Sequence, residues 1–380
     1  MMKRNNYFVL ICTILFCFGC KEPFEANLPP VPQGYLVVEG FINAQGPTQI
    51  KLSRSTPLDE KKKFKPDIGA LVKIEGDDNS SFLLINQFNG LYSSAPLTLN
   101  QSRKYRIHIR TGDSKEYFSD YVPVKITPAI DSINWAEDQN GVTVYANAHD
   151  DANKTIYYRW DYDETWEIHS AYVASWKYDN GFIRQTTVSE TNLYYYCWKY
   201  DTSGTIVIGS SAKLEKDIIH LNPILFIPST DEKTGVRYSI QVRQYALGKE
   251  EYEFLQQMKK NTESLGTIFD PQPSAIRGNI HSVSDPNELV IGYISATTMQ
   301  QKRIFISASE LKNSLFNLFN NCSNKLVPNN PDSLKGIVPP MWPYEGVGPP
   351  IPGPTHFKVS DTKCVDCRER GGKSIKPSFW

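Results

Sequence analysis

The chain has 380 residues, of which 41 are basic and 41 are acidic, so its formal net charge at pH 7 is zero. A chain of this length can bury two or three hydrophobic cores. Proteins that bind nucleic acid through their net charge need an excess of lysine and arginine, which this composition excludes. The one basic run, residues 61–65, lacks interleaved aromatic rings and is interpreted as a solvated loop.

The first twenty residues are typical of a bacterial lipoprotein signal peptide. After a basic start, an apolar run covers residues 7–18, and a small residue, Gly19, stands directly before Cys20. The run is too short to cross a membrane as a helix and ends at a cleavage pattern. We therefore predict a signal peptide over residues 1–19, lipid modification of Cys20 and a tether over residues 20–34. An ordinary secretory signal is the alternative, because Cys17 and Phe18 stand where a leucine and a small residue are usual.

The start of the predicted tether carries two acidic residues, Glu22 and Glu25. Their position after Cys20 resembles the surface-export signal of Bacteroidota lipoproteins, and the alternative is a solvated linker. The resemblance implies a lipid-anchored protein on the cell surface of the outer membrane, with the periplasmic face as the alternative. Acyl chains can hold a protein on a membrane without any transmembrane helix.

Residues 35–127 contain short β-rich runs that recur about every ten residues. The runs alternate apolar and polar side chains, which predicts a small β-sandwich. The runs at Gly69–Ile74 and Tyr105–Ile109 and the turn at Gly90 resemble the prealbumin-like, carboxypeptidase-regulatory type of sandwich. That resemblance implies a module that supports or binds rather than one that catalyses.

A second β-sandwich, of Ig-like type, is predicted over residues 128–326, and it includes the strand-like runs Leu289–Ala296 and Arg303–Ser307. Its distinguishing feature is aromatic density. Exposed rings at one end of a sandwich would form a platform for sugar rings or for a flat partner surface, whereas buried rings would be core packing. The tryptophans that are candidates for ligand or partner contact in this domain are Trp160, Trp166, Trp176 and Trp198.

Short helices are predicted as additions to this second domain. Lys249–Ser264 has apolar residues at helical spacing. Ser307 and Glu310 form a capping-box pattern before an apolar run at 311–319, so that a second helix would end near Cys322. The predicted fold is therefore mainly β, with tandem β-sandwich domains, one or two short helices and a Pro-rich C-terminal loop.

Residues 327–380 are predicted to form this Pro-rich loop and a C-terminal segment with a Cys-x-x-Cys motif. Nine prolines between residues 327 and 354 exclude a helix or a central strand. Trp342 and Tyr344 lie in this loop and are further candidates for ligand or partner contact. They either pack on the body of the protein or insert into a partner.

Four cysteines remain if the signal peptide is removed and Cys20 is acylated. An even number in an exported chain predicts disulfides, but three pairings are possible and the sequence does not choose among them. The Cys-x-x-Cys spacing also occurs in zinc and redox sites, which remain alternatives. The disulfide candidates are Cys197, Cys322, Cys364 and Cys367.

The sequence contains no Gly-x-Ser-x-Gly elbow, no His-Glu-x-x-His helix and no phosphate-binding loop. We therefore predict no enzymatic activity, no catalytic residues, no metal and no cofactor. The acids Asp161, Asp163 and Glu164 are interpreted as an exposed strand edge, with a calcium site as the alternative. A hydrolase assembled from His169 or His220 with distant acids is the remaining enzymatic alternative.

Motifs along nearly the whole mature chain resemble a Bacteroidota lipoprotein family known only as domain of unknown function 4249. The terminal motif is the most specific, because cysteines, paired glycines and a final Phe-Trp at fixed spacing seldom coincide. The motifs are Leu36–Gly40, Arg159–Ile168, Tyr196–Trp198, Ile268–Asp270, Gly278–Ile280, Gly292–Ile294, Lys302–Ile306, Cys364–Arg368, Gly371–Gly372 and Lys376–Trp380.

This resemblance implies an outer-membrane lipoprotein, typically encoded beside a TonB-dependent receptor, with no established enzymatic activity. Our first hypothesis is a non-catalytic accessory or substrate-binding subunit of a TonB-dependent import complex. Its partners would be the receptor and the membrane that holds the lipid anchor. The alternative is a structural or adhesive envelope lipoprotein without a small-molecule ligand. Buried aromatic rings would favour this alternative, and an exposed row of rings would favour binding.

Overall fold

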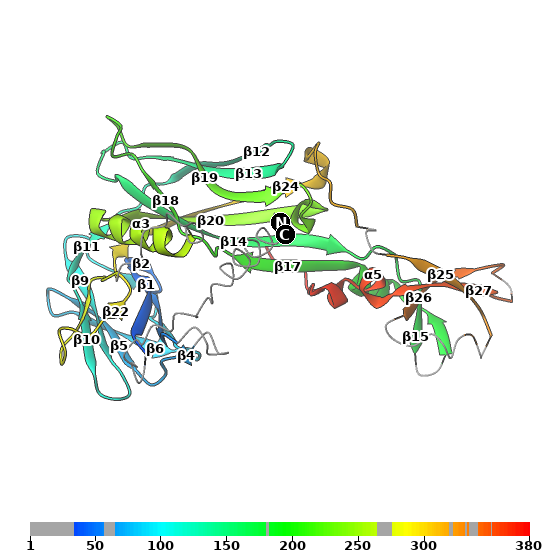
Figure 1. The fold of residues 1–380 in the computed structure, drawn as a ribbon, viewed down its shortest axis with the longest axis horizontal. Coiled ribbons are helices and arrows are strands. Elements are labelled where there is room, and N and C mark those ends of the chain that lie inside the picture. The colour runs from blue at the N-terminus through cyan, green and yellow to red at the C-terminus, as the bar shows by residue number, and fades with distance from the viewer. Residues whose placement is uncertain are drawn as a thin grey trace, which may run out of the picture.

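The computed structural model describes residues 34–56, 65–179, 182–263, 276–318, 322–330, 333, 341–350 and 352–380. The predicted signal peptide, Cys20, nearly all of the tether, the basic run at 61–64 and the motif at 268–270 lie outside these residues. The structure has three parts, which we call the barrel, the body and the distal lobe: the barrel lies beneath one end of the body, and the distal lobe extends from the other end (Figure 1). In the described part of the chain, no helix is long and apolar enough to cross a membrane.

The barrel is a closed ring of eight strands among the described residues. Its interior is packed by alternate side chains of these strands, including the fully buried Leu36, Ile50 and Ile74. Side chains of a strand alternate between two faces, so every second residue enters the core. The strands are β1 (Leu36–Asn43), β3 (Gln49–Arg54), β5 (Leu71–Gly76), β6 (Ser81–Asn86), β7 (Leu91–Ser93), β9 (Lys104–Arg110), β11 (Val122–Lys125) and β23 (Ala296–Thr297).

The prediction of tandem β-sandwich domains is wrong, because the first sheet closes on itself. On one side β11 pairs with β9, Val122 opposite Tyr105. On its other side β11 pairs in parallel with β23, which in turn pairs in parallel with β1. The strand that closes the ring is therefore supplied by Ala296 and Thr297, which are remote in sequence from β1 and β11. Local alternation over residues 35–127 gives no sign of this strand.

Shorter strands extend the barrel at its edges. Two of them come from a segment expected in the second domain: β21 pairs with β10, and β22 pairs with β1. These pairings, together with that of β23, assign residues 280–297 to the barrel rather than to a second sandwich. The added strands are β4 (Lys65–Pro66), β10 (Glu116–Ser119), β21 (Ile280–Ser282) and β22 (Val290–Ile291). Two further strands, β2 (Gln45–Gly46) and β8 (Leu97–Thr98), pair with each other as a separate small sheet.

The body consists of two sheets that share one hydrophobic core. Strand β14 supplies Tyr158, Trp160 and Tyr162 to it, because alternate residues of this long strand face the other sheet. One sheet contains β12 (Ile130–Glu137), β13 (Gly141–His149) and β19 (Ile218–Pro228). The other contains β14 (Tyr157–His169), β17 (Tyr196–Thr202), β18 (Val207–Ser210), β20 (Arg237–Leu247) and β24 (Met299–Ser307).

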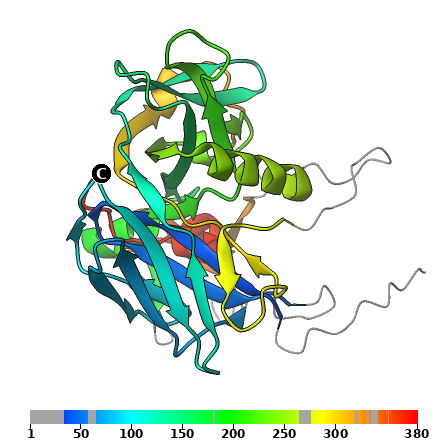
Figure 2. The same ribbon diagram turned by 90° about the vertical axis from the view of Figure 1, so that its left-hand side faces the viewer.

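Helix α3 (Lys249–Glu263) confirms the first predicted helix and runs along the junction between the body and the barrel (Figure 2). Phe254 of this helix packs against Tyr293, and Glu251 accepts a hydrogen bond from Ser295 (2.9 Å). Phe41 of β1 also meets Tyr245 of β20, with ring centroids 4.9 Å apart. Apolar and polar contacts together therefore hold the two parts against each other.

The second predicted helix is wrong. A short 3-10 turn, η2 (Ala308–Glu310), follows Ser307, and the described residues 311–318 form no helix. The capping contact itself is present, since the carboxylate of Glu310 accepts a hydrogen bond from the Ser307 N–H (2.7 Å). A Cβ on Gly235 would lie only 2.5 Å from the ring of Phe316, so Phe316 packs directly on the backbone of Gly235. The segment therefore packs against the body in an irregular conformation.

The distal lobe is built from two small sheets. The Pro-rich segment contributes an edge strand to it, and Pro343 sits at a register shift in that strand, a position that proline tolerates. The lobe and its connections contain β15 (Trp176–Asp179), β16 (Phe182–Gln185), α2 (Val188–Tyr195), β25 (Asn324–Pro328), β26 (Met341–Val347), β27 (His356–Asp361), α5 (Thr362–Val365) and η3 (Cys367–Arg370). A short 3-10 turn, η1 (Glu232–Thr234), connects β19 with β20 in the body.

Candidate binding groove

The tryptophans of the predicted aromatic platform lie inside the protein. Trp160 is 1% exposed, and its indole N–H donates to the side-chain oxygen of Gln244 (2.9 Å). Trp166 and Trp198 are also buried, at 7% and 6% exposure. Trp176 is partly buried in the core of the distal lobe. The structure therefore brings no exposed row of tryptophans together on the described surface.

The two aromatic residues of the Pro-rich segment also pack within the protein. Tyr344 is buried and stacks on Tyr172 with ring centroids 4.5 Å apart. The indole N–H of Trp342 donates to the backbone oxygen of Trp176 (3.0 Å), and its ring meets Tyr194. The Pro-rich segment was predicted either to pack on the body of the protein or to insert into a partner. These contacts show that its two aromatic residues pack on the rest of the chain.

All four candidate cysteines form disulfides, in a pairing that the sequence left open. Cys197 of β17 is bonded to Cys367 of η3, and Cys322 is bonded to Cys364 of α5. Both bonds have their Cα atoms 5.8 Å apart, a normal separation. Each cysteine of the Cys-x-x-Cys motif thus pairs with a distant partner, so of the predicted alternatives the structure shows disulfides.

The two bonds fix a C-terminal segment, residues 362–380, that we call the clasp. After η3 the chain turns at Gly371 in the left-handed region (φ 83°). A Cβ on Gly372 would lie 2.5 Å from the Cβ of Cys197, so only glycine lets the chain pass this close. Lys373 then forms a two-way backbone bridge with Trp198 (2.8 and 2.9 Å), which adds the clasp to the edge of β17.

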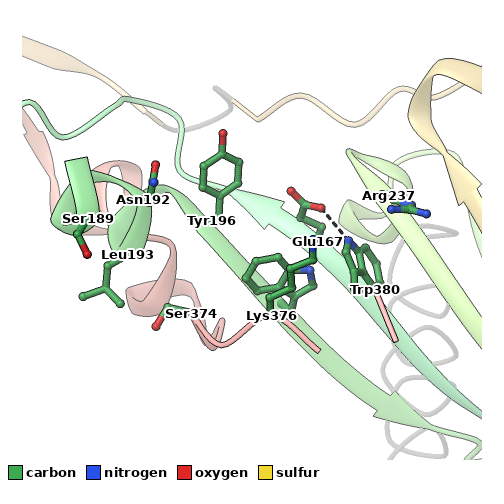
Figure 3. A pocket seen from close by; sticks show the side chains of 10 residues that line it. Glu167, Ser189, Asn192, Leu193, Tyr196, Arg237, Ser374, Lys376 and Trp380 are labelled. Atoms are coloured by element: carbon green, nitrogen blue, oxygen red, sulfur yellow. Dashed lines mark hydrogen bonds between the residues drawn. The ribbon is translucent and has the colours of Figure 1, made fainter. Parts of the chain in front are cut away.

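The clasp and the body enclose an open groove of about 510 Å³, the clasp groove (Figure 3). This volume is within the usual range of small-molecule sites. The side chains come from β14, α2, β17, β20 and the clasp. The lining residues are Glu167, Ser189, Asn192, Leu193, Tyr196, Trp198, Arg237, Ser374, Lys376 and Trp380.

Glu167 carries the negative charge of the groove. One of its oxygens accepts a hydrogen bond from the indole N–H of Trp380 (3.1 Å), and the other contacts a ring nitrogen of His169 (2.7 Å). Burial opposes ionisation of this carboxyl, but the hydrogen bonds from His169 and Trp380 outweigh it and lower its pKa. Glu167 is therefore an ionised acceptor at neutral pH.

Arg237 carries positive charge on the opposite strand, β20. Its guanidinium lies over the ring of Phe305 (4.4 Å to the centroid) and near that of Trp380 (5.4 Å). Trp198 meets Trp380 edge to face, yet the Trp198 indole N–H has no hydrogen-bond partner among the described residues. Charge of both signs and aromatic surface thus meet in one groove, which suits a polar solute with an acidic group.

The interpretation of Asp161, Asp163 and Glu164 as an exposed strand edge is wrong, because β14 pairs with β17 on one side and with β20 on the other. Asp161 and Asp163 both bind Arg243, and Glu164 is buried and bonded to Lys233 (2.8 Å). Over the described ranges of the chain, no group of three or more His, Cys, Asp or Glu side chains is placed to hold a metal ion. The three acids are therefore occupied by protein cations.

Of the residues that line the clasp groove, Trp198 is the one that the sequence predicts as a ligand or partner contact. Glu167, Arg237 and Trp380 are far apart in the chain, and no spacing rule connects them. His169 touches the groove through Glu167, whereas His220 is exposed on β19. The motifs Arg159–Ile168, Tyr196–Trp198 and Lys376–Trp380 contain groove residues, but these motifs indicate the family resemblance and not a binding role.

The fold and the groove define a mainly β, disulfide-bonded protein with a surface groove built by its own C-terminus. The chain belongs to the family described as Domain of unknown function (DUF4249), whose model matches residues 21–303. That match stops before the clasp, which is therefore outside the family model. No curated protein matches the chain.

Two solved structures show a distant likeness. Chitinase ChiA74 from Bacillus thuringiensis is 8% identical, with a TM-score of 0.16 over 54% of this chain. The BSP domain of a biofilm-associated protein is also 8% identical, with a TM-score of 0.13 over 79% of this chain. This chain spans 29% of the chitinase and 64% of the biofilm-associated protein. Likenesses of this size carry no argument about function.

Proposed function

We propose that this protein is a non-catalytic accessory or substrate-binding subunit of an outer-membrane import complex, held by a lipid on Cys20 and paired with a TonB-dependent receptor. The observation that carries the binding role is the clasp groove, an open site with a carboxylate, a guanidinium and indole rings. The receptor partner, the Bacteroidota source and the surface location follow from the sequence resemblance and belong to the same proposal.

Rigidity of the groove supports this role. The clasp is fixed by two disulfides, a backbone bridge to Trp198 and the hydrogen bond from Trp380 to Glu167. A site whose parts are already in place loses less conformational entropy when a solute binds. We therefore expect the groove to bind its solute without a large rearrangement of the protein.

A structural or adhesive envelope lipoprotein without a ligand remains the second candidate. Two observations favour it: Trp160, Trp166 and Trp198 are buried, and both disulfides hold the C-terminal segment against the rest of the chain. The two candidates differ in what the protein holds. A binding subunit has a stoichiometric partner and a solute, whereas an adhesive protein has neither.

The deciding experiment is affinity purification of the native, lipidated protein from detergent-solubilised outer membrane, followed by mass spectrometry. The proposal expects a TonB-dependent receptor at a one-to-one ratio. If the protein is isolated alone, under conditions that keep other membrane complexes intact, the result would contradict the proposal and favour the structural or adhesive candidate. A chain with Cys20→Ala is the control for anchoring.

Solute binding is tested separately on the groove. We expect stabilisation of the purified chain by members of a panel of oligosaccharides and of short peptides with a free carboxylate. Arg237→Gln should weaken that binding at least tenfold, because it removes the guanidinium, one of the two cationic side chains that line the groove with Lys376. Lys325→Gln, an exposed lysine on β25, is the matched control. Equal binding by both variants would remove Arg237 from the site.

A further inference from the structure

The end of the barrel where the tether enters carries an exposed apolar surface. Ile68 is 64% exposed, Ile85 is 62% exposed and Phe88 is 85% exposed, and Leu71 adds a fourth apolar side chain. We call these four residues the tether-end rim. Large apolar side chains gathered at one end of a soluble fold mark a surface that meets something apolar.

Strand register shows why the rim residues face outward. Val72 pairs with Leu84, and both of these side chains are buried in the barrel. The next step of the same antiparallel register brings Leu71 opposite Ile85, on the outer face. Their apolar character therefore does not serve the core of the barrel.

The turn between β6 and β7 presents Phe88 in an unusual backbone conformation. Phe88 has φ 72°, in the left-handed region that bulky side chains rarely adopt, and Asn89 follows at φ 49°. The Phe88 N–H donates to the side chain of Asn86 (2.8 Å), which holds the turn. A strained turn that exposes a phenylalanine is a feature that a purely structural turn does not need.

The rim and the point where the chain enters the barrel lie at the same end. Tyr35 accepts a hydrogen bond from Ser55 (2.9 Å), and Ser53 pairs with Pro66 of β4. A Cβ on Gly90 would stand 3.2 Å from the Cβ of Pro66, so the Phe88 turn packs beside β4. Figure 1 shows β4, β5 and β6 at the side of the barrel that lies away from the body.

We propose that the tether-end rim inserts into the lipid bilayer that carries the Cys20 anchor and so fixes the orientation of the protein on the membrane. This proposal rests on the lipid anchor in the proposed function. The fourteen residues 20–33 reach at most about 50 Å when extended, and they enter at the rim, so anchor and rim face the same membrane. Lys65 and Asp113, both exposed beside Ile68, have opposite charges, so the proposal rests on the apolar side chains of the rim.

The test uses the full lipidated chain in phosphatidylcholine and phosphatidylethanolamine vesicles that contain a lipid with a diazirine in its acyl chain. After illumination, mass spectrometry locates the labelled peptides. We expect labels on residues 65–71 and 85–91, reduced at least fivefold in the double variant Ile68→Ser, Phe88→Ser. The matched control is Ile218→Ser, Phe226→Ser, which removes two equally apolar, exposed side chains from β19 of the body.

Labelling at the rim that does not exceed labelling on the Phe226 strand would overturn the proposal. The proposal would also be overturned if the rim peptides escaped lipid labelling and were covered by a copurified protein, since the occupant of the rim would then be a protein. The vesicles contain no receptor, so the result is independent of receptor pairing. The same spectra report acyl chains on Cys20, and an unlipidated chain that still labels at the rim would reject the anchor while supporting lipid insertion.

Discussion

Glu251 is a buried carboxyl at the junction of the body and the barrel. One of its oxygens accepts from Ser295, and the other has no hydrogen-bond partner among the described residues. Burial raises the pKa of Glu251 from its ordinary value of 4.5 to about 7, although the positive charge of Arg159 opposes this. Glu251 is thus largely protonated in the folded protein just below neutral pH.

This pKa makes stability depend on pH. Between pH 4.5 and pH 7 the unfolded chain releases the Glu251 proton while the folded chain keeps it, so the free energy of unfolding falls as pH rises. Compared with the Glu251→Gln variant, the free energy of unfolding of the native protein should fall by about 3 kcal/mol across this pH window and change little outside it. Urea unfolding at several pH values measures the difference. Glu250→Gln, an exposed neighbour, is the control, and parallel curves for the native protein and Glu251→Gln would contradict the assignment.

Gly372 provides a second prediction at the residue scale. A Cβ there would stand 2.5 Å from the Cβ of Cys197 and 3.0 Å from the backbone oxygen of Cys367. We expect Gly372→Ala to lower the free energy of unfolding by about 1 to 3 kcal/mol through overpacking. Gly204→Ala has open space around its Cβ and should have little effect. Equal melting temperatures for the two variants would show that the clasp can move away from β17.

At the scale of elements, the disulfides determine how firmly the clasp is held. Cys197–Cys367 closes a loop of 170 residues and Cys322–Cys364 one of 42. Loss of either bond removes a restriction on the unfolded chain and should cost about 2 to 5 kcal/mol, with about 1 kcal/mol more for the longer loop.

Denaturant unfolding of Cys367→Ser and Cys364→Ser under oxidising conditions measures these costs. Each of these variants leaves one free cysteine, which could mispair. Two double variants without a free cysteine from the broken bond are the controls: the first combines Cys197→Ser with Cys367→Ser, and the second combines Cys322→Ser with Cys364→Ser. The clasp groove should lose solute binding in the first double variant, because its wall depends on that bond. Unchanged stability in the oxidised variants would argue against the pairing.

The elements also show what the sequence could predict. Helix α3 was visible from the spacing of its apolar residues, and most barrel strands from their alternation. The prediction of a helix at 311–319 is wrong. Its capping contact forms, but Phe316 in the following segment packs against Gly235 in an irregular conformation. Tertiary packing can override local helix propensity in this way.

For the whole molecule, the barrel cannot be an independent N-terminal domain. Its closing strand β23 comes after the body strands, and β24, which follows directly, returns to the body. We expect residues 35–127 alone to lack a cooperative unfolding transition, because β1 and β11 would be left with unpaired edges. Circular dichroism and limited proteolysis of this fragment, with the full chain as the reference, test the expectation. A fragment that unfolds cooperatively would contradict it.

The sequence by itself determined what acts over a few residues: the β-rich composition, the alternation of the strands, helix α3 and an even number of cysteines that favoured disulfides. Only the tertiary structure decided the closure of the barrel by β23, the pairing of Cys197 with Cys367, the burial of Trp160 and the assembly of the clasp groove. The physical reason is that propensity and alternation report each residue's immediate neighbours. Sheet closure, disulfide pairing and groove formation depend on contacts between segments that are far apart in the sequence.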